Sequence, residues 1–407
     1  MTEEWFFLEN TFQHYPWGSK DGISTLLNFR NSENLPIAEL WMGAHQSAPS
    51  RIKTSDGPVA LNEAIRSDPD RFLGQSCRKR FGDTLPYLFK VLSAAHPLSI
   101  QVHPGKAQAR SGFERENRLG IPLTSPERNY RDPNHKPEVI LALTPFTAMC
   151  GFRPVQETAD LIRQTGIREL VSSVASLEAN GDYRVFLQEL WSLPDASKRI
   201  ILDDLSSLLE TVPGKDLSDA SRHPLSAVRL LSDEYPGDIG IVSPLYLNTV
   251  NLNSGEALYL SEGILHAYLS GTGIELMANS DNVLRGGLTQ KHIDVPELLS
   301  VVSSDPHTPR RLVPVSDTTR SRYPSPAEEF ELQLLQLEGD SLTTDFSAPT
   351  IVLVTHGKLD IADASGCTSP LPRGSSIFIP AESGSLTFSG EGIAYLATVP
   401  HTRTGAA

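Results

Sequence analysis

The feature that most constrains the fold of this chain is a set of four metal-ligand candidates in two separated blocks of sequence. Gln101 and His103 lie two residues apart, so on a β-strand both side chains point to the same face. A carboxylate, Glu138, follows in the same block, whereas the imidazole of His266 lies far downstream. Such nitrogen and oxygen ligands suit zinc, and a coordination position left open makes a zinc site catalytic. A fold that unites these residues must return the chain to the first block after the long segment between Glu138 and His266.

A change in the spacing of apolar residues at about residue 154 predicts that the segment between the two blocks forms a separate helical domain. Before it, short apolar runs at 85–92 and 97–103 are punctuated by Gly, Pro and Asn, as in β-strands. After it, Ile201, Leu205 and Leu209 recur at intervals that place them on one face of a helix. We therefore expect a helical domain at 154–241, inserted into a discontinuous β domain made of residues 1–153 and 242–315.

A weak internal repeat predicts a second β unit at the C-terminal end, residues 316–407. The segments 255–261 and 374–380 both have a turn glycine, a short strand and another turn. The first copy leads to His266, whereas the second reaches Ser385 at the same offset and offers no ligand. A polar stretch rich in Pro and Ser, 316–326, predicts a linker between the units. The expected fold is mainly β with an inserted α-helical module, and only the first of two β-sandwich or barrel units carries metal.

Two motifs carry a family resemblance. The first is Tyr130-x-Asp132-x-Asn134-His135-Lys136-Pro137-Glu138, and the second runs from His266-Ala267-Tyr268 to Arg285-Gly286-Gly287-Leu288-Thr289. Together with shorter blocks at 15–18, 38–43 and 86–92, they resemble the type I mannose-6-phosphate isomerases, also called phosphomannose isomerases. Two departures are Gly286, where the family usually has Ala, and Gln290, where it usually has Pro. Neither removes a side chain to which we assign chemistry.

The resemblance implies a fold, a cofactor and a reaction. It implies two cupin-type jelly-roll β-barrels, the first of which carries one zinc ion per chain. The zinc ligands that it implies are Gln101, His103, Glu138 and His266. The implied reaction interconverts D-mannose 6-phosphate and D-fructose 6-phosphate by ring opening and proton transfer through a cis-enediol. The mannose 6-phosphate that this reaction forms would be used for GDP-mannose synthesis.

Five residues of the motifs are candidates for catalysis. Arg285 matches the family's catalytic arginine, and its permanent charge suits it to holding developing negative charge. Lys136 and His135 are the candidate proton carriers, because a lysine near a cation can have a lowered pKa and act as a base. Asp281 and Glu275 are further acid or base candidates. Each has a structural alternative: Lys136 can simply pair with a carboxylate, His135 can orient a metal ligand, and the two acids can position Arg285.

Trp17, Ser99 and Lys90 are candidates for contact with the substrate. Trp17 can stack on a sugar face or merely pack in a core. Ser99 lies two residues before Gln101, so its hydroxyl faces the same side of the expected strand and can meet a phosphate. No glycine-rich phosphate loop of the P-loop type is present in the sequence.

The net charge of −14 opposes nucleic-acid binding, which requires a basic surface, and an anionic sugar phosphate needs a local positive pocket instead. No apolar stretch approaches the roughly 20 residues that span a membrane. The three cysteines, Cys77, Cys150 and Cys367, are few and odd in number, which favours a reducing compartment. We expect a cytoplasmic monomer that binds a small-molecule sugar phosphate and neither nucleic acid nor membrane.

Two other functions fit the same ligands. His103, Glu138 and His266 also form the triad of two histidines and one carboxylate that cupin-type iron oxygenases use. A non-catalytic sugar-phosphate sensor on the same scaffold is the second alternative. Lys136 and Arg285 favour chemistry on an anionic sugar over both alternatives.

Overall fold

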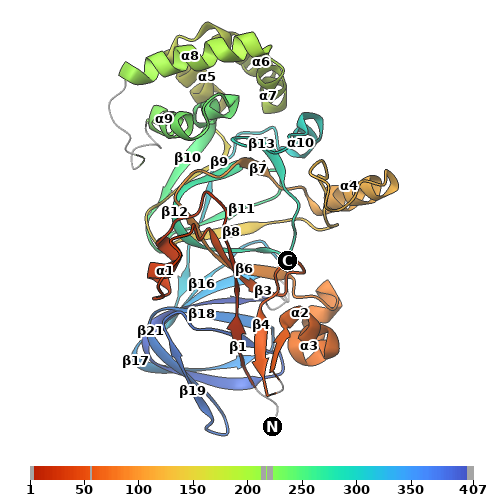
Figure 1. Cartoon of the computed structure of the whole chain (residues 1–407), viewed down its shortest axis with the longest axis vertical. Helices are drawn as coiled ribbons and strands as arrows, with labels where there is room; N and C mark the ends of the chain where they lie inside the picture. The colour runs from red at the N-terminus through yellow and green to blue at the C-terminus, as the bar shows by residue number, and fades with distance from the viewer. Residues whose placement is uncertain (1–3, 56, 212–216, 218–222, 401–407) are drawn as a thin grey trace.

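The computed structural model describes residues 4–55, 57–211, 217 and 223–400. The ends of the predicted domains, 1–3 and 401–407, lie outside this range. Along the long axis a helical layer lies at one end, a first β-sheet lies in the middle, and a second sheet lies at the opposite end (Figure 1). The expectation of a mainly β protein with a helical part is confirmed. None of the helices in the described part is long and apolar enough to cross a membrane.

The middle sheet has eleven strands, most of them antiparallel neighbours that are far apart in sequence. Seven strands form the main path, and the other four lie off it: β7 and β9 pair with β12, β13 pairs with β7, and β10 pairs with β9. The main path is β14 (Arg310–Leu312), β11 (Ala257–Leu260), β8 (Glu138–Ala142), β12 (His266–Ala278), β6 (Tyr87–Ala94), β3 (Glu39–Gly43) and β2 (Thr11–Gln13), and the other four strands are β10 (Leu247–Leu252), β9 (Phe146–Phe152), β7 (Ile100–Val102) and β13 (Leu284–Gly287).

The long strand β12 changes partners along its length. Its first residues pair with β7 and β9, whereas residues from Gly271 onward pair with β6 and β8. Gly271 has a φ of +117°, and a Cβ atom there would lie 2.6 Å from the carbonyl oxygen of Pro145. Only glycine fits this close approach without strain. One strand thereby delivers His266 and Glu275 to two parts of the same sheet.

The second sheet has ten strands and contains most of the C-terminal chain. Contrary to the expectation of a linker at 316–326, residues 320–323 of this stretch form a strand that pairs with β15 on one side and β17 on the other. The N-terminal strand β1 also joins this sheet, where Phe6 lies opposite Phe378. The strands are β15 (Val315–Ser316), β16 (Arg320–Tyr323), β17 (Glu331–Phe346), β21 (Gly384–Thr398), β18 (Thr350–Asp363), β20 (Ser376–Ile379), β1 (Phe6–Glu9), β4 (Arg51–Thr54), β5 (Gly57–Ala60) and β19 (Thr368–Pro372).

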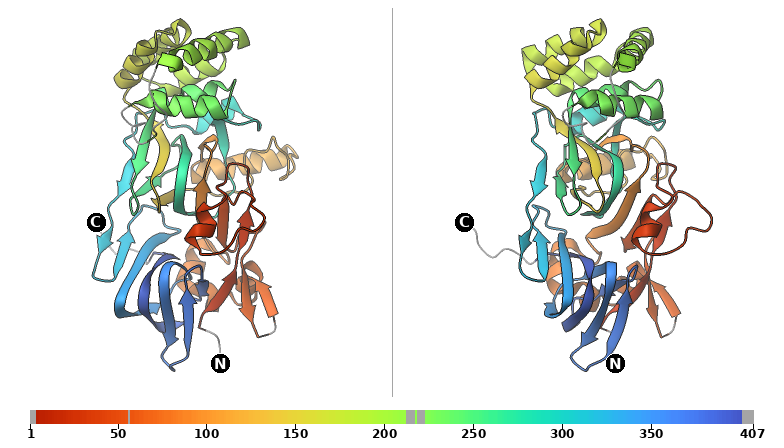
Figure 2. Two further views of the ribbon diagram at one scale, coloured as in Figure 1. Left: turned by 60° about the vertical axis from the view of Figure 1, so that its left-hand side comes forward. Right: turned by 90° about the vertical axis from the view of Figure 1, so that its left-hand side faces the viewer.

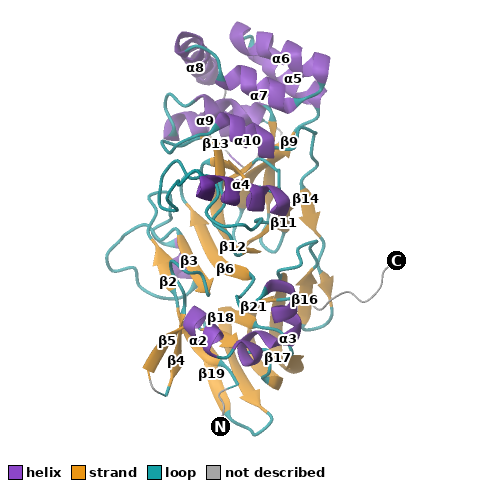
Figure 3. Cartoon of the chain, turned by 90° about the vertical axis from the view of Figure 1, so that its right-hand side faces the viewer, coloured by secondary structure: helices purple, strands orange, loops and turns teal. Residues whose placement is uncertain are grey.

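The helices between 154 and 241 form the layer above the middle sheet (Figure 2). In α8 the residues Ile201, Leu205 and Leu209 are buried, as their spacing predicts. The layer consists of α5 (Val155–Thr165), α6 (Arg168–Asn180), α7 (Tyr183–Trp191), α8 (Asp195–Thr211), α9 (Pro224–Glu234) and a 3-10 helix (Ile239–Leu245). Four of the other described helices lie beside the sheets (Figure 3): α1 (Gly22–Leu26), α2 (Leu61–Ser67), α3 (Pro69–Phe81) and α4 (Lys106–Arg118). The short helix α10 (Val295–Val301) lies at the base of the helical layer, against α7 and β13 (Figure 3).

Apolar cores join these three layers. The largest lies between the two sheets and includes Phe89 from the middle sheet and Phe378 from the second. Buried Tyr87 strengthens this junction, because its hydroxyl donates to backbone oxygens of Pro349 and Ala397 at 3.0 and 2.8 Å. Another core packs the helical layer onto β7, β9 and β13. The middle sheet is therefore held from both sides.

Candidate metal centre

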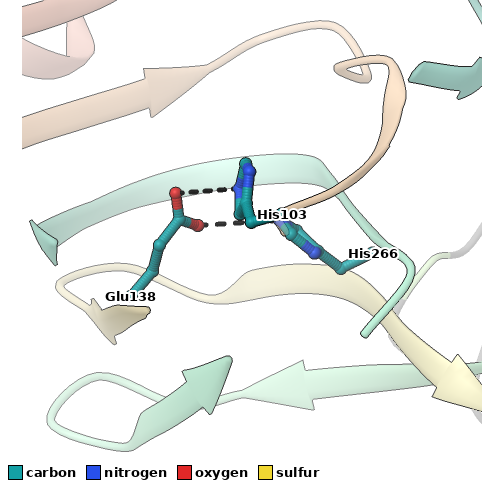
Figure 4. A group of neighbouring side chains, drawn as sticks. All are labelled: His103, Glu138 and His266. Atoms are coloured by element: carbon teal, nitrogen blue, oxygen red, sulfur yellow. Dashed lines mark ion pairs between the residues drawn. The ribbon is translucent and has the colours of Figure 1, made fainter. Parts of the chain in front are cut away.

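Three side chains from three strands meet inside the middle sheet (Figure 4). His103 follows β7, Glu138 begins β8 and His266 begins β12. Glu138 Oε1 lies 3.2 Å from His103 Nε2, and Glu138 Oε2 lies 3.6 Å from His266 Nε2. One ligand atom from each residue lies within 4.8 Å of the others, and all three residues are buried. A divalent ion with ligands about 2 Å away fits this spacing.

The hydrogen bonds of the two imidazoles leave the nitrogen that faces the cluster available to a metal ion. His103 Nδ1 lies 2.7 Å from the carbonyl oxygen of Asn282, and His266 Nδ1 lies 2.8 Å from that of Ile264. Because a carbonyl oxygen only accepts, each Nδ1 donates and each Nε2 presents its lone pair. His266 Nε2 is buried without a hydrogen-bond partner, which is costly unless a ligand occupies it. The donor set therefore fits a zinc ion.

Burial and charge hold these ligands in the protonation states that coordinate metals. Burial and the ammonium group of Lys136 lower the pKa of His103 to about 4, so this imidazole is neutral at neutral pH. Burial alone would raise the pKa of Glu138, but Lys136 and His103 hold it well below its ordinary value. Lys136 Nζ lies 2.6 Å from Glu138 Oε1 and 3.5 Å from His103 Nε2. Neutral imidazoles and an ionised carboxylate are the forms that bind metal.

The strand register places two further predicted site residues beside the cluster. Gln101 in β7 lies directly opposite both His266 in β12 and Arg285 in β13. Residues directly opposite one another point to the same face of a sheet, so these three side chains share the face of the cluster. The neighbouring Ile100 and Val102 point instead into the core beneath the helical layer. This register favours Gln101 as a fourth ligand, which stays a prediction.

Arg285 belongs to a group of cations that also contains Arg131 and Lys291. Burial and the charge of Arg131 lower the pKa of Arg285. Burial and the charges of Arg285 and Arg131 lower the pKa of Lys291. Such effects require like charges close enough to repel, and an anion between them would relieve the repulsion. Arg131 is not among the candidates from sequence, although its place inside the first motif is a signal that could have identified it.

Lys90 is the centre of a buried ionic network on β3, β6 and β12. Its Nζ lies 3.0 Å from Glu275 Oε2 and 3.5 Å from Glu39 Oε1. The indole of Trp41 donates to Glu39 at 2.8 Å, and the Lys90 ammonium lies 5.1 Å from the Trp41 ring centre. Burial lowers the pKa of Lys90, but Glu275 and Glu39 more than offset this and raise it above its ordinary value. Lys90 is therefore a charged, buried cation, and its contact with substrate stays a prediction.

Asp281 is paired with His45, which lies in no motif that predicts a catalytic or metal-binding role. His45 Nε2 lies 3.3 Å from Asp281 Oδ1, and His45 Nδ1 lies 2.8 Å from the hydroxyl of Ser47. Although partial burial raises the pKa of Asp281, His45 and Lys136 together lower it. The structure thus places Asp281, whose side chain is 46% exposed, near Lys136. Glu275 instead lies deep in the network around Lys90.

His135 points away from the metal cluster. In the extended segment that leads into β8, alternation puts Lys136 and Glu138 on one side and His135 on the other. His135 Nε2 lies 2.8 Å from Glu329 Oε1, so the structure does not bring His135 to the cluster.

The two remaining substrate candidates lie near the site without a decisive contact. Trp17 packs against the apolar core around the cluster, with its ring centre 5.8 Å from that of Tyr15. Ser99 is half-buried immediately before β7. The roles of both residues stay predictions.

Comparisons with known proteins agree with this geometry. A model of the family described as phosphomannose isomerase type I, catalytic domain, matches residues 5–155. The mannose-6-phosphate isomerase of Escherichia coli (strain K12) is 40% identical over 389 residues, which cover 95% of this chain and 97% of that protein. The chain belongs to the type I phosphomannose isomerase family. The resemblance of its motifs to that family is confirmed.

The likeness to type I phosphomannose isomerases extends over the whole chain. The human mannose-6-phosphate isomerase is 32% identical over 413 residues, covering 92% of this chain and 93% of that protein. A crystal structure of the mannose 6-phosphate isomerase from Salmonella typhimurium, bound to substrate (F6P) and a zinc atom, matches with a TM-score of 0.89 and 37% identity. That match covers 98% of this chain and 100% of the other. The helical layer and both sheets are therefore shared with this relative.

Proposed function

We propose that this chain is a zinc-dependent aldose–ketose isomerase that interconverts D-mannose 6-phosphate and D-fructose 6-phosphate. The observation that carries the proposal is the buried cluster of His103, Glu138 and His266, in which His266 Nε2 lacks a partner. The relatives bear the same activity in their names, and the Salmonella typhimurium structure holds zinc and F6P. The product mannose 6-phosphate would supply GDP-mannose synthesis.

The residues that would hold the zinc ion are His103, Glu138, His266 and, as the fourth ligand, Gln101. A bound zinc ion would supply Lewis acidity for the oxygens of the sugar. The Nδ1 hydrogen bonds of both histidines fix the ring orientation that this coordination needs. Cys150 lies opposite His266, but burial raises the pKa of its thiol to about 12, so it remains a protonated neighbour.

The substrate anion would bind at the cations around Arg285. Arg131, Arg285 and Lys291 concentrate positive charge at one place in a chain whose net charge is −14. Arg131 and Lys291 would hold the phosphate, and Arg285 would stabilise the negative charge that develops during enediol formation. Ser99 and Trp17 would contribute a hydroxyl contact and a stacking surface.

Lys136 would carry the proton between C2 and C1. Its Nζ is directed into the cluster, 2.6 Å from Glu138 Oε1, whereas His135 is turned away toward Glu329. Asp281 lies near Lys136 and is held by His45, so it can exchange protons with solvent during ring opening. Glu275 would keep Lys90 in place in the buried network.

We also propose that the two sheets correspond to two cupin-type jelly-roll units, the first of which carries the metal. Residues 1–153 and 242–315 would form the catalytic unit, 154–241 the inserted helical domain, and 316–407 the metal-free unit. The pairing of β1 with β20 adds the N-terminal strand to the sheet of the second unit. We expect the whole protein to act as a cytoplasmic monomer.

Turnover of mannose 6-phosphate to fructose 6-phosphate tests the function directly. The assay is run on purified protein, after chelation, and again after addition of zinc. Activity that chelation removes and zinc restores supports the isomerase. Folded, zinc-loaded protein without turnover would contradict it and favour the sensor, while oxygen consumption with iron would favour the oxygenase.

A further inference from the structure

A cavity distinct from the metal centre lies on the other face of β8, the strand that carries Glu138. Its volume is about 660 Å³, and it is lined by residues of the middle sheet and its connections, by the first residue of α4 and by the connection between β16 and β17. Six of the lining residues matter for its chemistry: Lys106, His135, Tyr259, His307, Arg310 and Glu329. None of them belongs to the metal cluster.

The alternation of side chains separates this cavity from the metal centre. Val139 in β8 and Tyr259 in β11 belong to the core between the two sheets, whereas Ile140 and Leu260 belong to the core around the metal cluster. His135 lies on the same side as Val139, because the two residues are an even number of positions apart. The cavity and the metal centre are thus on opposite faces of the same strands.

Glu329 presents an unsatisfied oxygen in this cavity. The residue is 6% exposed, and its Oε1 accepts from His135 at 2.8 Å. Its Oε2 is buried and has no hydrogen-bond partner. Burial would raise the pKa of Glu329, but His135 holds it below its ordinary value, so the carboxylate is ionised. A buried carboxylate oxygen without a donor is destabilising, and a ligand hydroxyl group would satisfy it.

Two cations at the rim of the cavity are available to an anion. Lys106 and Arg310 are exposed, and among the described residues neither forms a salt bridge. Arg310 lies against the ring of Tyr259, 5.9 Å from its centre, and Lys106 is close enough to Glu329 to help lower the pKa of that carboxyl group. Glu262 and Glu328 also reach the rim, so a bare anion is a poorer match than one that carries hydroxyl donors.

We propose that this cavity is a second ligand site for a phosphorylated polyhydroxy compound. Lys106 and Arg310 bind its phosphate, and its hydroxyl groups donate to Glu329. His135, which pairs with Glu329, connects the site to the motif that carries Lys136 and Glu138. The site is independent of the proposed reaction and is detected by binding alone.

Glucose 1-phosphate is a suitable probe, because phosphate on the anomeric oxygen prevents the ring opening that isomerisation needs. Its binding to the zinc-loaded full chain is measured by calorimetry. We expect a dissociation constant below about 1 mM, weakened about tenfold in Arg310→Gln and in Glu329→Gln. Arg311→Gln is the matched control, because this neighbouring arginine pairs with Glu256 outside the cavity and should leave binding unchanged.

Lys291→Gln distinguishes this cavity from the substrate site. Binding that persists in Lys291→Gln and weakens in Arg310→Gln supports the proposal. Absence of binding to the wild-type chain overturns it, and so does binding that is lost in Lys291→Gln but unchanged in Arg310→Gln. Arg310 is exposed, so its substitution leaves the fold intact even if Glu329→Gln does not fold.

Discussion

Substitution of Lys90 by Met tests the energetic role of the buried ionic network. Met is similar in length and leaves no large void, but it removes the cation between Glu275 and Glu39. The two carboxylates are 3% and 6% exposed, so they would remain buried without their partner. Breaking a buried ion pair in this way typically costs about 3–5 kcal/mol. We therefore expect Lys90→Met to lower the free energy of unfolding by about that amount at pH 8.

The loss should depend on pH in a defined direction. Burial already raises the pKa of Glu275, and removal of Lys90 takes away the charge that opposes this rise. A carboxyl group whose pKa is higher in the folded state contributes stability below its ordinary pKa and loses it as pH rises through the folded-state value. The deficit of Lys90→Met should therefore be small near pH 5 and grow toward pH 8.

Urea unfolding followed by tryptophan fluorescence measures this deficit, with chelated protein used throughout so that metal loss does not contribute. Lys53→Met is the control, because Lys53 pairs with Glu9 at the surface and its loss should cost less than about 1 kcal/mol. The double variant Lys90→Met/Glu275→Gln should recover part of the stability. A Lys90→Met deficit that equals the Lys53→Met deficit, or that shrinks as pH rises, would refute the reasoning.

Four further outcomes are expected. His266→Ala should abolish stoichiometric zinc binding and turnover, measured by metal analysis and rate. Asn282→Ala should weaken zinc binding about 10–100-fold in a competition titration, because the lost side-chain amide holds the loop before Lys136 and so positions the backbone oxygen that orients His103. Arg285→Gln should lower kcat about 10²–10³-fold with zinc content unchanged, which steady-state rates and metal analysis check. In metal-free protein, the imidazole of His103 should titrate at pH about 4 by NMR, so the stability that its neutral form contributes above pH 6.5 is lost as pH falls toward 4.

The metal centre was largely predictable from sequence because its ligands obey local rules. The spacing of Gln101 and His103 requires only strand alternation, and the helical spacing of Ile201, Leu205 and Leu209 requires only one buried face. Alternation in the segment before β8 also separates Lys136 from His135 and, with Glu138 as a ligand, predicts Lys136 on the side of the metal. The partner of His135 was not predictable, because Glu329 comes from a distant part of the chain.

Other features depend on pairings that no local pattern encodes. The pairing of β3 with β6 brings Glu39 and Trp41 to Lys90. His45 gains its partner because Asp281, far away in the sequence, lies beside it. Residues 316–326 have the composition of a linker, yet part of this stretch forms β16 because β17 offers it an unpaired edge. Tertiary pairing overrides local preference in such strands.

The order of the metal ligands along the chain has a consequence for biosynthesis. His103 and Glu138 precede the helical layer, whereas His266 follows it. A chain that is still being synthesised therefore leaves the ribosome with two ligands long before the third, and β12 cannot pair with β7 and β8 until then. The core of the helical layer also includes Leu265 and Leu284, so this layer too is completed only after the later strands are made. The cluster of His103, Glu138 and His266 can therefore be completed only late in synthesis.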